Sequence, residues 1–223
     1  SGGGTQRKRA DAPSPIAGRV LLFADGLRMD VAQKLSASLK TAGYAPAIDW
    51  EWSTVPSVTA TAKPAASPIP DAFAGGEADD QFSARLAASG QLVTQERFTA
   101  ALEGRGWTVL EGQQTGDPSG FGWTETGTLD KRGHNEGWKM ARSVDSEVRD
   151  IAARVSALLS AGWNEVTVIT DHGWLLVPGG LPKVQLTMAL AEHRWGRCAA
   201  LKSGAQVDLP TFTWHWNGEV AIA

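Results

Sequence analysis

Carboxylate and imidazole side chains gather at a few places along the chain. The candidates are Asp25, Asp130, His134, Asp171, His172 and His215. Carboxylates and imidazoles are the ligands that zinc, manganese and iron take in proteins, and each must lose its proton to bind. Taken singly, each has an ordinary explanation, because an Asp after a strand commonly closes a turn and a lone histidine is commonly a core residue. Together, the six groups would be enough for two metal ions.

Two of these carboxylates follow predicted strands. Residues 19–24 and 165–170 are short apolar runs typical of buried strands in a parallel sheet, and they end at Asp25 and Asp171. In open sheets of this kind, ligands bind beyond the carboxyl ends of the strands. We therefore expect Asp25 and Asp171 to lie at the same edge of one sheet.

Helices are predicted between the strands. Apolar residues recur at helical spacing over 31–39 and over 144–158. Weaker patterns predict a helix within 92–102 and a strand at 107–110. Helices that alternate with apolar strands predict an α/β domain, with a mainly parallel central sheet flanked by helices.

The remaining segments carry turn and loop signals. Residues 62–80 and 111–127 are rich in Gly, Pro and polar residues and read as irregular excursions. Asn217-Gly218 predicts a hairpin with a type I′ turn, and Gly133 argues that Asp130 and His134 lie in a loop rather than on one helix. Residues 1–17 read as a linker or a cloning scar, and residues 18–223 as the domain.

Composition excludes several classes of protein. The net charge of −3 gives no basic field for coating nucleic acid, and Cys198 alone makes neither an internal disulfide nor a thiolate zinc cage. No apolar run approaches the roughly 20 residues of a membrane-spanning helix, so we expect a cytoplasmic protein without membrane contact. Phosphate-loop, nucleophile-elbow and H-E-x-x-H motifs are missing from the sequence.

The order of the candidate ligands resembles that of the alkaline phosphatase superfamily. Asp25 is followed by D-x-x-G-H at 130–134, by D-H-G at 171–173 and by a late His215. Within this superfamily, the segments DGLRMD and ITDHG look like those of PglZ domains of BREX-type phage-defence proteins. The resemblance covers most of the chain and implies an alkaline-phosphatase-like core.

The resemblance also implies roles for individual residues. Asp25, Asp171 and His172 would hold one divalent metal ion, and Asp130, His134 and His215 would hold the other. Zinc is the expected metal and manganese the alternative, since such ligand sets accept both. Other phage-defence proteins would be partners, in a larger chain or complex.

The superfamily's nucleophile is a Ser or Thr at a helix N-terminus, and Thr59 in the segment VPSVTA matches that position. A hydroxyl there would face amides that favour a bound phosphate. Ser57 and Thr61 are the fallbacks, and Thr59 as one small residue of an alanine-rich helix is the structural alternative. Arg28 and Lys63 are candidate phosphate-binding cations, although solvated surface cations are the plainer interpretation.

The resemblance thus implies a metal-dependent phosphodiesterase of a phage-defence system, which would pass through a phosphothreonine intermediate. A catalytically quiet metal-binding scaffold and a phosphomonoesterase are the alternatives. Base stacking on tryptophans near the proposed ligands would suit a nucleotide or nucleic-acid substrate. The tryptophans concerned are Trp52, Trp123, Trp138, Trp174, Trp214 and Trp216.

Overall fold

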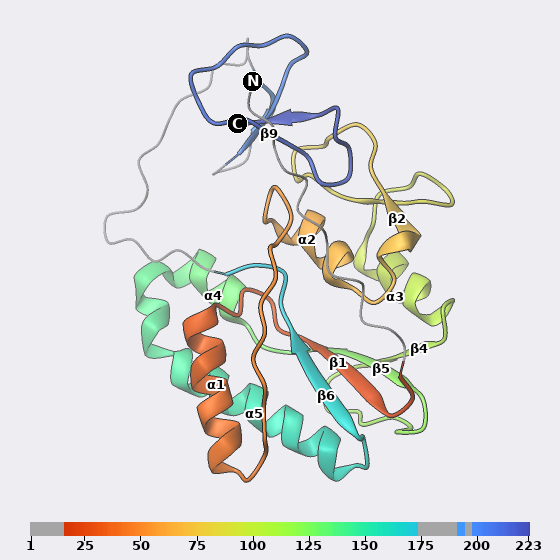
Figure 1. The fold of residues 1–223 in the computed structure, drawn as a ribbon, viewed down its shortest axis with the longest axis vertical. Helices are drawn as coiled ribbons and strands as arrows, with labels where there is room; N and C mark the ends of the chain where they lie inside the picture. Colours follow the sequence, from red (N-terminus) through yellow and green to blue (C-terminus); the bar gives the residue numbers. More distant parts are fainter. Residues whose placement is uncertain (1–15, 174–190, 195–197) are drawn as a thin grey trace.

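The structure, a computed structural model, describes residues 16–173, 191–194 and 198–223. At its centre is a four-stranded parallel sheet in the order β4-β5-β1-β6 (Figure 1). Its strands are β1 (Arg19–Phe23), β4 (Trp107–Leu110), β5 (Phe121–Glu125) and β6 (Glu165–Ile169). The predicted α/β architecture, with a parallel central sheet flanked by helices, is confirmed at this level.

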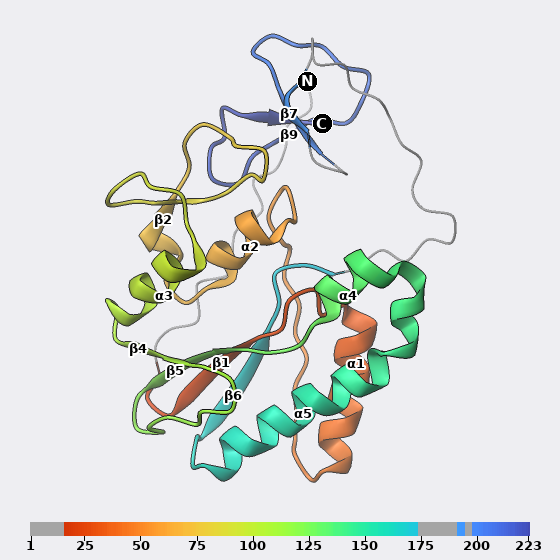
Figure 2. The same ribbon diagram turned by 180° about the vertical axis from the view of Figure 1, so that it is seen from behind.

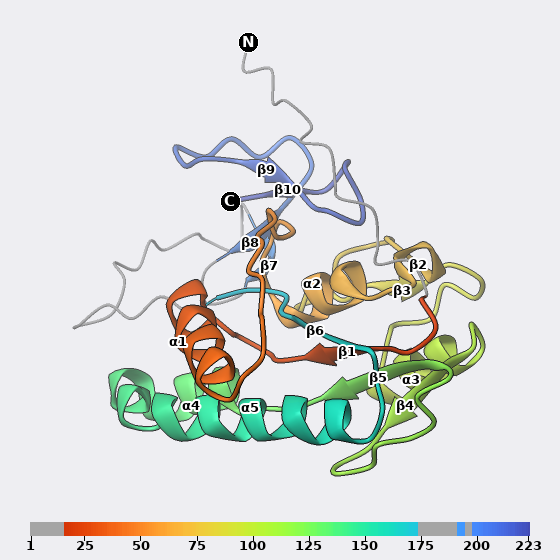
Figure 3. The ribbon, with the colours of Figure 1, turned by 60° about the horizontal axis from the view of Figure 1, so that its bottom comes forward.

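Two helices cover one face of the sheet, α1 (Met29–Thr41) and α5 (Val144–Ser160) (Figure 3). Their apolar stripes pack against alternate residues of β1, such as Val20 and Leu22, which are fully buried. Both helices were predicted from their hydrophobic spacing, and burial of that stripe explains why the spacing was informative.

The opposite face is covered by shorter elements (Figure 2). The helix α3 (Gln95–Glu103) packs Phe98 against Trp123 and against the β1 residues that point away from α1. Its hydroxyl cap is Thr94, whose side chain accepts a hydrogen bond from the Arg97 amide. The remaining elements on this side are α2 (Thr59–Ala66), the 3-10 helix η1 (Pro70–Ala72) and the strand pair β2 (Phe73–Ala74) and β3 (Arg85–Leu86).

A second, antiparallel sheet of four short strands lies beyond α2. Its order is β7 (Ala191–Arg194), β8 (Ala199–Leu201), β10 (Ala221–Ile222), β9 (Phe212–Thr213). Indole N–H groups on the loop after β9 attach this sheet to α2. Trp214 Nε1 donates to Thr61 Oγ1 at 3.1 Å, and Trp216 Nε1 donates to the Thr61 carbonyl at 3.0 Å.

The structure corrects three sequence-based predictions about local conformation. The stretch 111–127 was expected to be irregular, yet it contains β5 at the centre of the sheet. The Asp130–His134 segment lies in the helix α4 (Leu129–Glu136), which continues into the 3-10 helix η2 (Gly137–Arg142), so Gly133 does not break it. A hairpin does join β9 to β10, but the turn is not type I′, because Asn217 and Gly218 both lack the positive φ that this turn requires.

Strand β5 was not predicted because it contains a glycine, Gly122, at a position where the neighbouring residues leave no room for a side chain. A Cβ atom on Gly122 would lie 2.9 Å from Val20 Cγ2 and 3.0 Å from Trp163 Cη2. The prediction that residues 62–80 are irregular was also too broad, since α2 extends to Ala66. Among the described strands, β6 lies at the edge of the sheet, and its residues are half-buried or exposed rather than fully buried as expected. None of the helices in the described residues is long and apolar enough to cross a membrane.

Candidate metal centre

Two predicted ligands meet because they follow neighbouring strands. β1 pairs with β6 in parallel, with Phe23 opposite Ile169, and the pairing continues as the Ala24 amide donates to the Ile169 carbonyl at 2.9 Å. Asp25 and Asp171 therefore leave the sheet at the same edge, as predicted. His172, the next residue, is buried, with 5% of its side chain exposed.

Asp130 comes to this edge from the first turn of α4. The turn after Asp25 contains Gly26 at φ +69°, and a Cβ atom there would lie 3.0 Å from the Cβ atom of Asp130. Glycine is therefore required twice at this position, for the left-handed backbone and for the close approach of α4. This contact places the Asp130 carboxylate beside that of Asp25.

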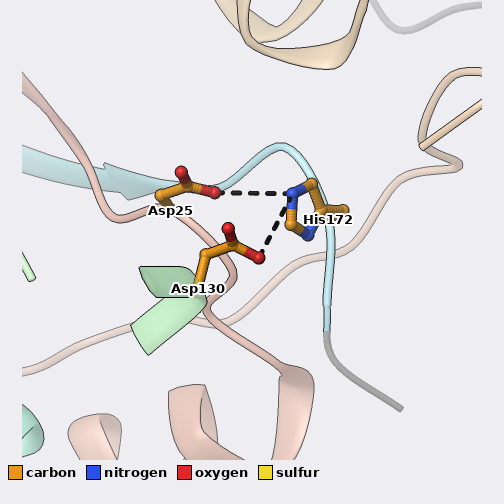
Figure 4. Close-up of side chains that lie close together, drawn as sticks. All are labelled: Asp25, Asp130 and His172. Atoms are coloured by element: carbon orange, nitrogen blue, oxygen red, sulfur yellow. Dashed lines mark ion pairs between the residues drawn. The ribbon is translucent and has the colours of Figure 1, made fainter. Parts of the chain in front are cut away.

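Asp25, Asp130 and His172 form the group that could hold a metal ion (Figure 4). His172 Nε2 lies 3.4 Å from Asp25 Oδ1 and 3.9 Å from Asp130 Oδ1, and one ligand atom from each residue lies within 4.8 Å of the others. Zinc bonds of about 2.0–2.2 Å in a tetrahedral site separate neighbouring ligand atoms by about 3.4 Å. The distance from His172 to Asp25 matches this separation, and the distance from His172 to Asp130 is longer, so the group could hold one cation.

Asp171 supports this assignment independently. Its side chain is 0% exposed, and its Oδ1 accepts a hydrogen bond from the His172 amide at 2.9 Å. Its Oδ2 lies 3.7 Å from His172 Nε2 and has no hydrogen-bond partner among the described residues. A buried carboxylate oxygen without a partner is costly, and a cation within the group would compensate that cost.

The tautomer of His172 also suits metal binding. Its Nδ1 lies 3.1 Å from the Gly173 carbonyl oxygen. Because a carbonyl only accepts hydrogen bonds, we assign the ring hydrogen to Nδ1, which leaves the lone pair of Nε2 directed at the two carboxylates. Such a contact from the other ring nitrogen is the usual way that proteins orient a ligating histidine.

The electrostatics of the group reflect three carboxylates around one imidazole. Burial, followed by the charges of Asp171 and Asp130, raises the pKa of Asp25 to about 7. Burial also raises the pKa of Asp171, against the opposing effect of His172. Without a cation, the negative charges of these carboxylates therefore repel one another.

The hydroxyl of Thr59 lies at the same group. Thr59 is the first residue of α2, and its Oγ1 lies 3.1 Å from His172 Nε2 and 3.4 Å from Asp25 Oδ1. The helix begins after Val58, whose backbone is extended, so the first turn of α2 faces the group. Of the candidate nucleophiles, Thr61 is fully buried and donates to the Phe82 carbonyl at 2.6 Å, and Ser57 is exposed.

Comparisons with protein family models, with curated proteins and with solved structures found no match. The resemblance to PglZ domains accordingly stays a prediction that rests on the motifs themselves. What the site can do must be judged from its geometry.

Of the other ligands expected for a second metal, His134 lies beside Asp130 and His215 lies outside the group of three. His134 Nε2 lies 3.3 Å from Asp130 Oδ2, so Asp130 turns one oxygen to His172 and the other to His134. His215 is exposed, its ring packs against Trp216 at 4.8 Å, and its amide donates to the Val55 carbonyl. The described residues thus bring together one group of three ligands, which combines members of both predicted sets.

The two cations expected to bind phosphate already have carboxylate partners. Arg28 forms two hydrogen bonds with Asp30, at 2.9 and 2.7 Å. Lys63 lies on α2 one turn after Thr59, as expected, but its ammonium contacts Glu125 Oε2 at 2.7 Å. The same ammonium lies about 5 Å above two aromatic rings, at 5.2 Å from Phe23 and 5.1 Å from Phe98. Lys63 is therefore part of the packed core beside the site.

The tryptophans named for base stacking divide into two kinds. Trp123 and Trp214 are fully buried and Trp216 is half-buried, whereas Trp52 and Trp138 are 68% and 62% exposed. Trp174 lies outside the described residues. The prediction that these tryptophans stack on bases is therefore wrong for Trp123 and Trp214, whose rings are buried.

Sequence reasoning missed Ser53, whose hydroxyl donates to the Asp171 carbonyl. It also missed Trp50, which pairs with Trp52. The signal available was the alternation of acidic and tryptophan residues in the segment DWEW.

Proposed function

We propose that this protein is a metal-dependent hydrolase of phosphoric esters, with phosphodiesters as the preferred class and Thr59 as the nucleophile. The observation that carries the proposal is the position of Thr59 Oγ1, 3.1 Å from His172 Nε2 and 3.4 Å from Asp25 Oδ1. A hydroxyl that begins a helix and also touches the metal-ligand group is placed for attack on a bound phosphoryl centre.

The donor set favours a divalent cation held by Asp25, Asp130 and His172, with the buried oxygen of Asp171 behind them. Zinc is the first choice, manganese the second, and a second cation beside Asp130 and His134 belongs to the same proposal. When bound, such a cation would lower the pKa of the Thr59 hydroxyl and place positive charge beside the phosphoryl oxygens.

The residues of the chain account for the remaining steps. Thr59 Oγ1 loses its proton to solvent and forms a bond to phosphorus, while the bond from phosphorus to the departing alcohol oxygen breaks and that oxygen takes a proton. Water then forms a bond to phosphorus as the bond to Thr59 Oγ1 breaks, which restores the hydroxyl. The amides of the first turn of α2 favour the negative charge on the phosphoryl group throughout.

The wider setting follows from the motifs. A PglZ-like domain with an alkaline-phosphatase-like core, acting in the cytoplasm with other phage-defence proteins, would be consistent with DGLRMD at Asp25 and ITDHG at Asp171. A quiet metal-binding scaffold would use the same ligands but would not need Thr59.

The test compares turnover of bis(p-nitrophenyl) phosphate with that of p-nitrophenyl phosphate, with added zinc or manganese. We expect faster diester hydrolysis, a loss of about a thousandfold or more in Thr59→Ala, and retention within about tenfold in Thr59→Ser, which keeps the hydroxyl. Metal content measured by elemental mass spectrometry should be unchanged in both variants. Turnover that survives Thr59→Ala would overturn the nucleophile, and bound metal without any turnover would favour the scaffold.

A further inference from the structure

Two tryptophans on the segment between α1 and α2 are among the most exposed large apolar side chains of the described residues. Trp50 is 62% exposed and Trp52 is 68% exposed. Their rings lie 5.7 Å apart at an interplanar angle of 83°, so the two indoles meet at a right angle. Contiguous exposed apolar patches mark binding surfaces, whereas single exposed apolar residues are ordinary.

The charge of this segment is purely acidic. Asp49 and Glu51 alternate with the two tryptophans and are exposed, and residues 43–58 contain no Lys or Arg. Both carboxylates belong to residues next to the indoles in the chain, well within a Debye length of about 8–10 Å. A bound group would therefore meet aromatic faces in a local negative field.

The segment is attached to the metal centre. One residue after Trp52, the Ser53 hydroxyl donates to the carbonyl of Asp171, which precedes the ligand His172. Two residues further on, the Val55 carbonyl accepts a hydrogen bond from the His215 amide. Figures 1 and 3 both show the segment, in orange, passing the end of β6 before it enters α2. The tryptophan pair thus stands next to the edge where the ligands gather.

We propose that Trp50 and Trp52 bind a quaternary ammonium group carried by one alcohol of the phosphodiester substrate, so that the substrate class is a choline-type phosphodiester. This inference rests on the proposed function, because it assigns the substrate of the same centre. Aromatic faces attract organic cations through the ring quadrupole, and two perpendicular exposed indoles with acidic neighbours in the chain suit a compact, weakly hydrated cation.

The acidic residues decide between this ligand and a nucleic acid. A polyanionic strand that stacked on Trp50 and Trp52 would bring further phosphates toward Asp49 and Glu51, and like charges would oppose its binding. A zwitterionic diester places its phosphate at the cationic centre and its ammonium at the acidic segment. Charge complementarity thus favours the ammonium ester.

The kinetic experiment compares two chromogenic diesters that release the same p-nitrophenolate: p-nitrophenylphosphorylcholine and bis(p-nitrophenyl) phosphate. In Trp50→Ala and Trp52→Ala we expect KM for the choline ester to rise about tenfold, with kcat for the second ester unchanged within about twofold. Glu51→Gln should raise the same KM by a smaller factor. Phe212→Ala is the matched control, since it removes another exposed aromatic ring, 57% exposed on β9.

A binding experiment separates failure of this inference from failure of the proposed function. Tetramethylammonium chloride is titrated into metal-free protein, and the indole N–H resonances are followed by NMR against sodium chloride at equal ionic strength. We expect saturable shifts of the Trp50 and Trp52 resonances, and in Trp50→Ala or Trp52→Ala the remaining resonance of the pair should no longer shift, whether or not the protein hydrolyses either ester.

The outcomes differ cleanly. Saturable binding of tetramethylammonium without turnover of either ester would support the cation site but overturn its role in a phosphodiesterase. Turnover of both esters with no ammonium-induced shifts and no effect of the tryptophan variants would overturn the inference alone. Preference for the p-nitrophenyl ester of thymidine 5′-monophosphate, lost in the same variants, would assign the pair to a nucleobase instead.

Discussion

The Thr59 hydroxyl oxygen lies 3.1 Å from Nε2 of His172, although 113 positions separate the two residues in the chain. Neither residue reaches the other through local structure. Thr59 begins a helix on one face of the sheet, and His172 follows the edge strand β6. Their contact therefore depends on the whole α/β core.

Added zinc should stabilise the protein. A ligand at a hundred times its Kd contributes about 2.7 kcal/mol, which corresponds to a Tm increase of about 5–10 °C for a chain of this size. His172→Ala and Asp130→Asn should lose both the shift and the bound metal, measured by thermal denaturation and elemental mass spectrometry. Asp145→Asn, which removes an exposed carboxylate paired with Lys34, should keep both. An equal shift in all variants would place the zinc elsewhere.

The stability of the metal-free protein should fall as pH rises from 5 to 8. The pKa of Asp25 is about 7 in the folded protein against a reference value of 3.8, so in this window the folded state binds more protons than the unfolded state. Asp171, whose pKa is also raised, acts in the same direction. Urea denaturation in the presence of a chelator measures the effect.

The matched variant for this pH effect is Asp25→Asn, which cannot ionise. At pH 8, metal-free Asp25→Asn should be more stable than the unaltered protein by about 1–2 kcal/mol, after discounting for solvent screening of a side chain that is one-third exposed. Its stability should also vary less between pH 5 and 8. A free energy of unfolding that rises with pH in the unaltered protein would contradict this electrostatic picture.

Lys63 should matter for stability rather than for phosphate binding. Its side chain is 12% exposed and its ammonium pairs with Glu125, and removal of one partner of such a pair leaves an uncompensated charge. Burial raises the pKa of Glu125, but the charge and hydrogen bond of Lys63, together with hydrogen bonds from Trp123 and Gln95, outweigh it and hold that pKa below its usual range. Lys63→Met should therefore cost about 2–4 kcal/mol.

A double variant checks that interpretation. Lys63→Met combined with Glu125→Gln should recover part of the stability lost in Lys63→Met, because the unpaired charge is gone. Chemical denaturation of the single and double variants completes the cycle. If Lys63→Met instead raises KM for the diester and leaves the unfolding free energy unchanged, Lys63 is a substrate-binding residue after all.

Gly122 should tolerate no side chain. A methyl group there would approach Val20 and Trp163 within 3.0 Å or less in the middle of the sheet, so Gly122→Ala should destabilise the protein by about 1–3 kcal/mol. Gly218→Ala is the control, because no heavy atom lies within 4 Å of its added Cβ atom. Similar midpoints of denaturation for the two variants would show that β5 is packed differently.

The hydrophobic pattern of the sequence made α5 and β1 predictable. The stripe from Val144 to Leu158 becomes the buried face of α5, and the run before Asp25 becomes β1. Strand β5 was not predictable in the same way, because the need for Gly122 arises only from Val20 and Trp163, which lie far from it in the sequence.

The site was predictable to a similar extent. Asp25 and Asp171 could be placed together because both follow parallel strands. The approach of Asp130 could not, because it depends on a helix that Gly133 seemed to exclude. The pairing of Lys63 with Glu125 was equally hidden, since the carboxylate comes from the unpredicted strand β5.

Because the site depends on the close approach of α4 to Gly26, cation binding depends on the order of folding. Asp25, Asp130 and His172 come from three segments that are far apart in the chain, so the unfolded polypeptide cannot present them together without a large loss of chain entropy. High-affinity cation binding should therefore appear only after the slow, non-local pairing of β1 with β6. In a refolding experiment, the cation would act as a late reporter of the completed native topology.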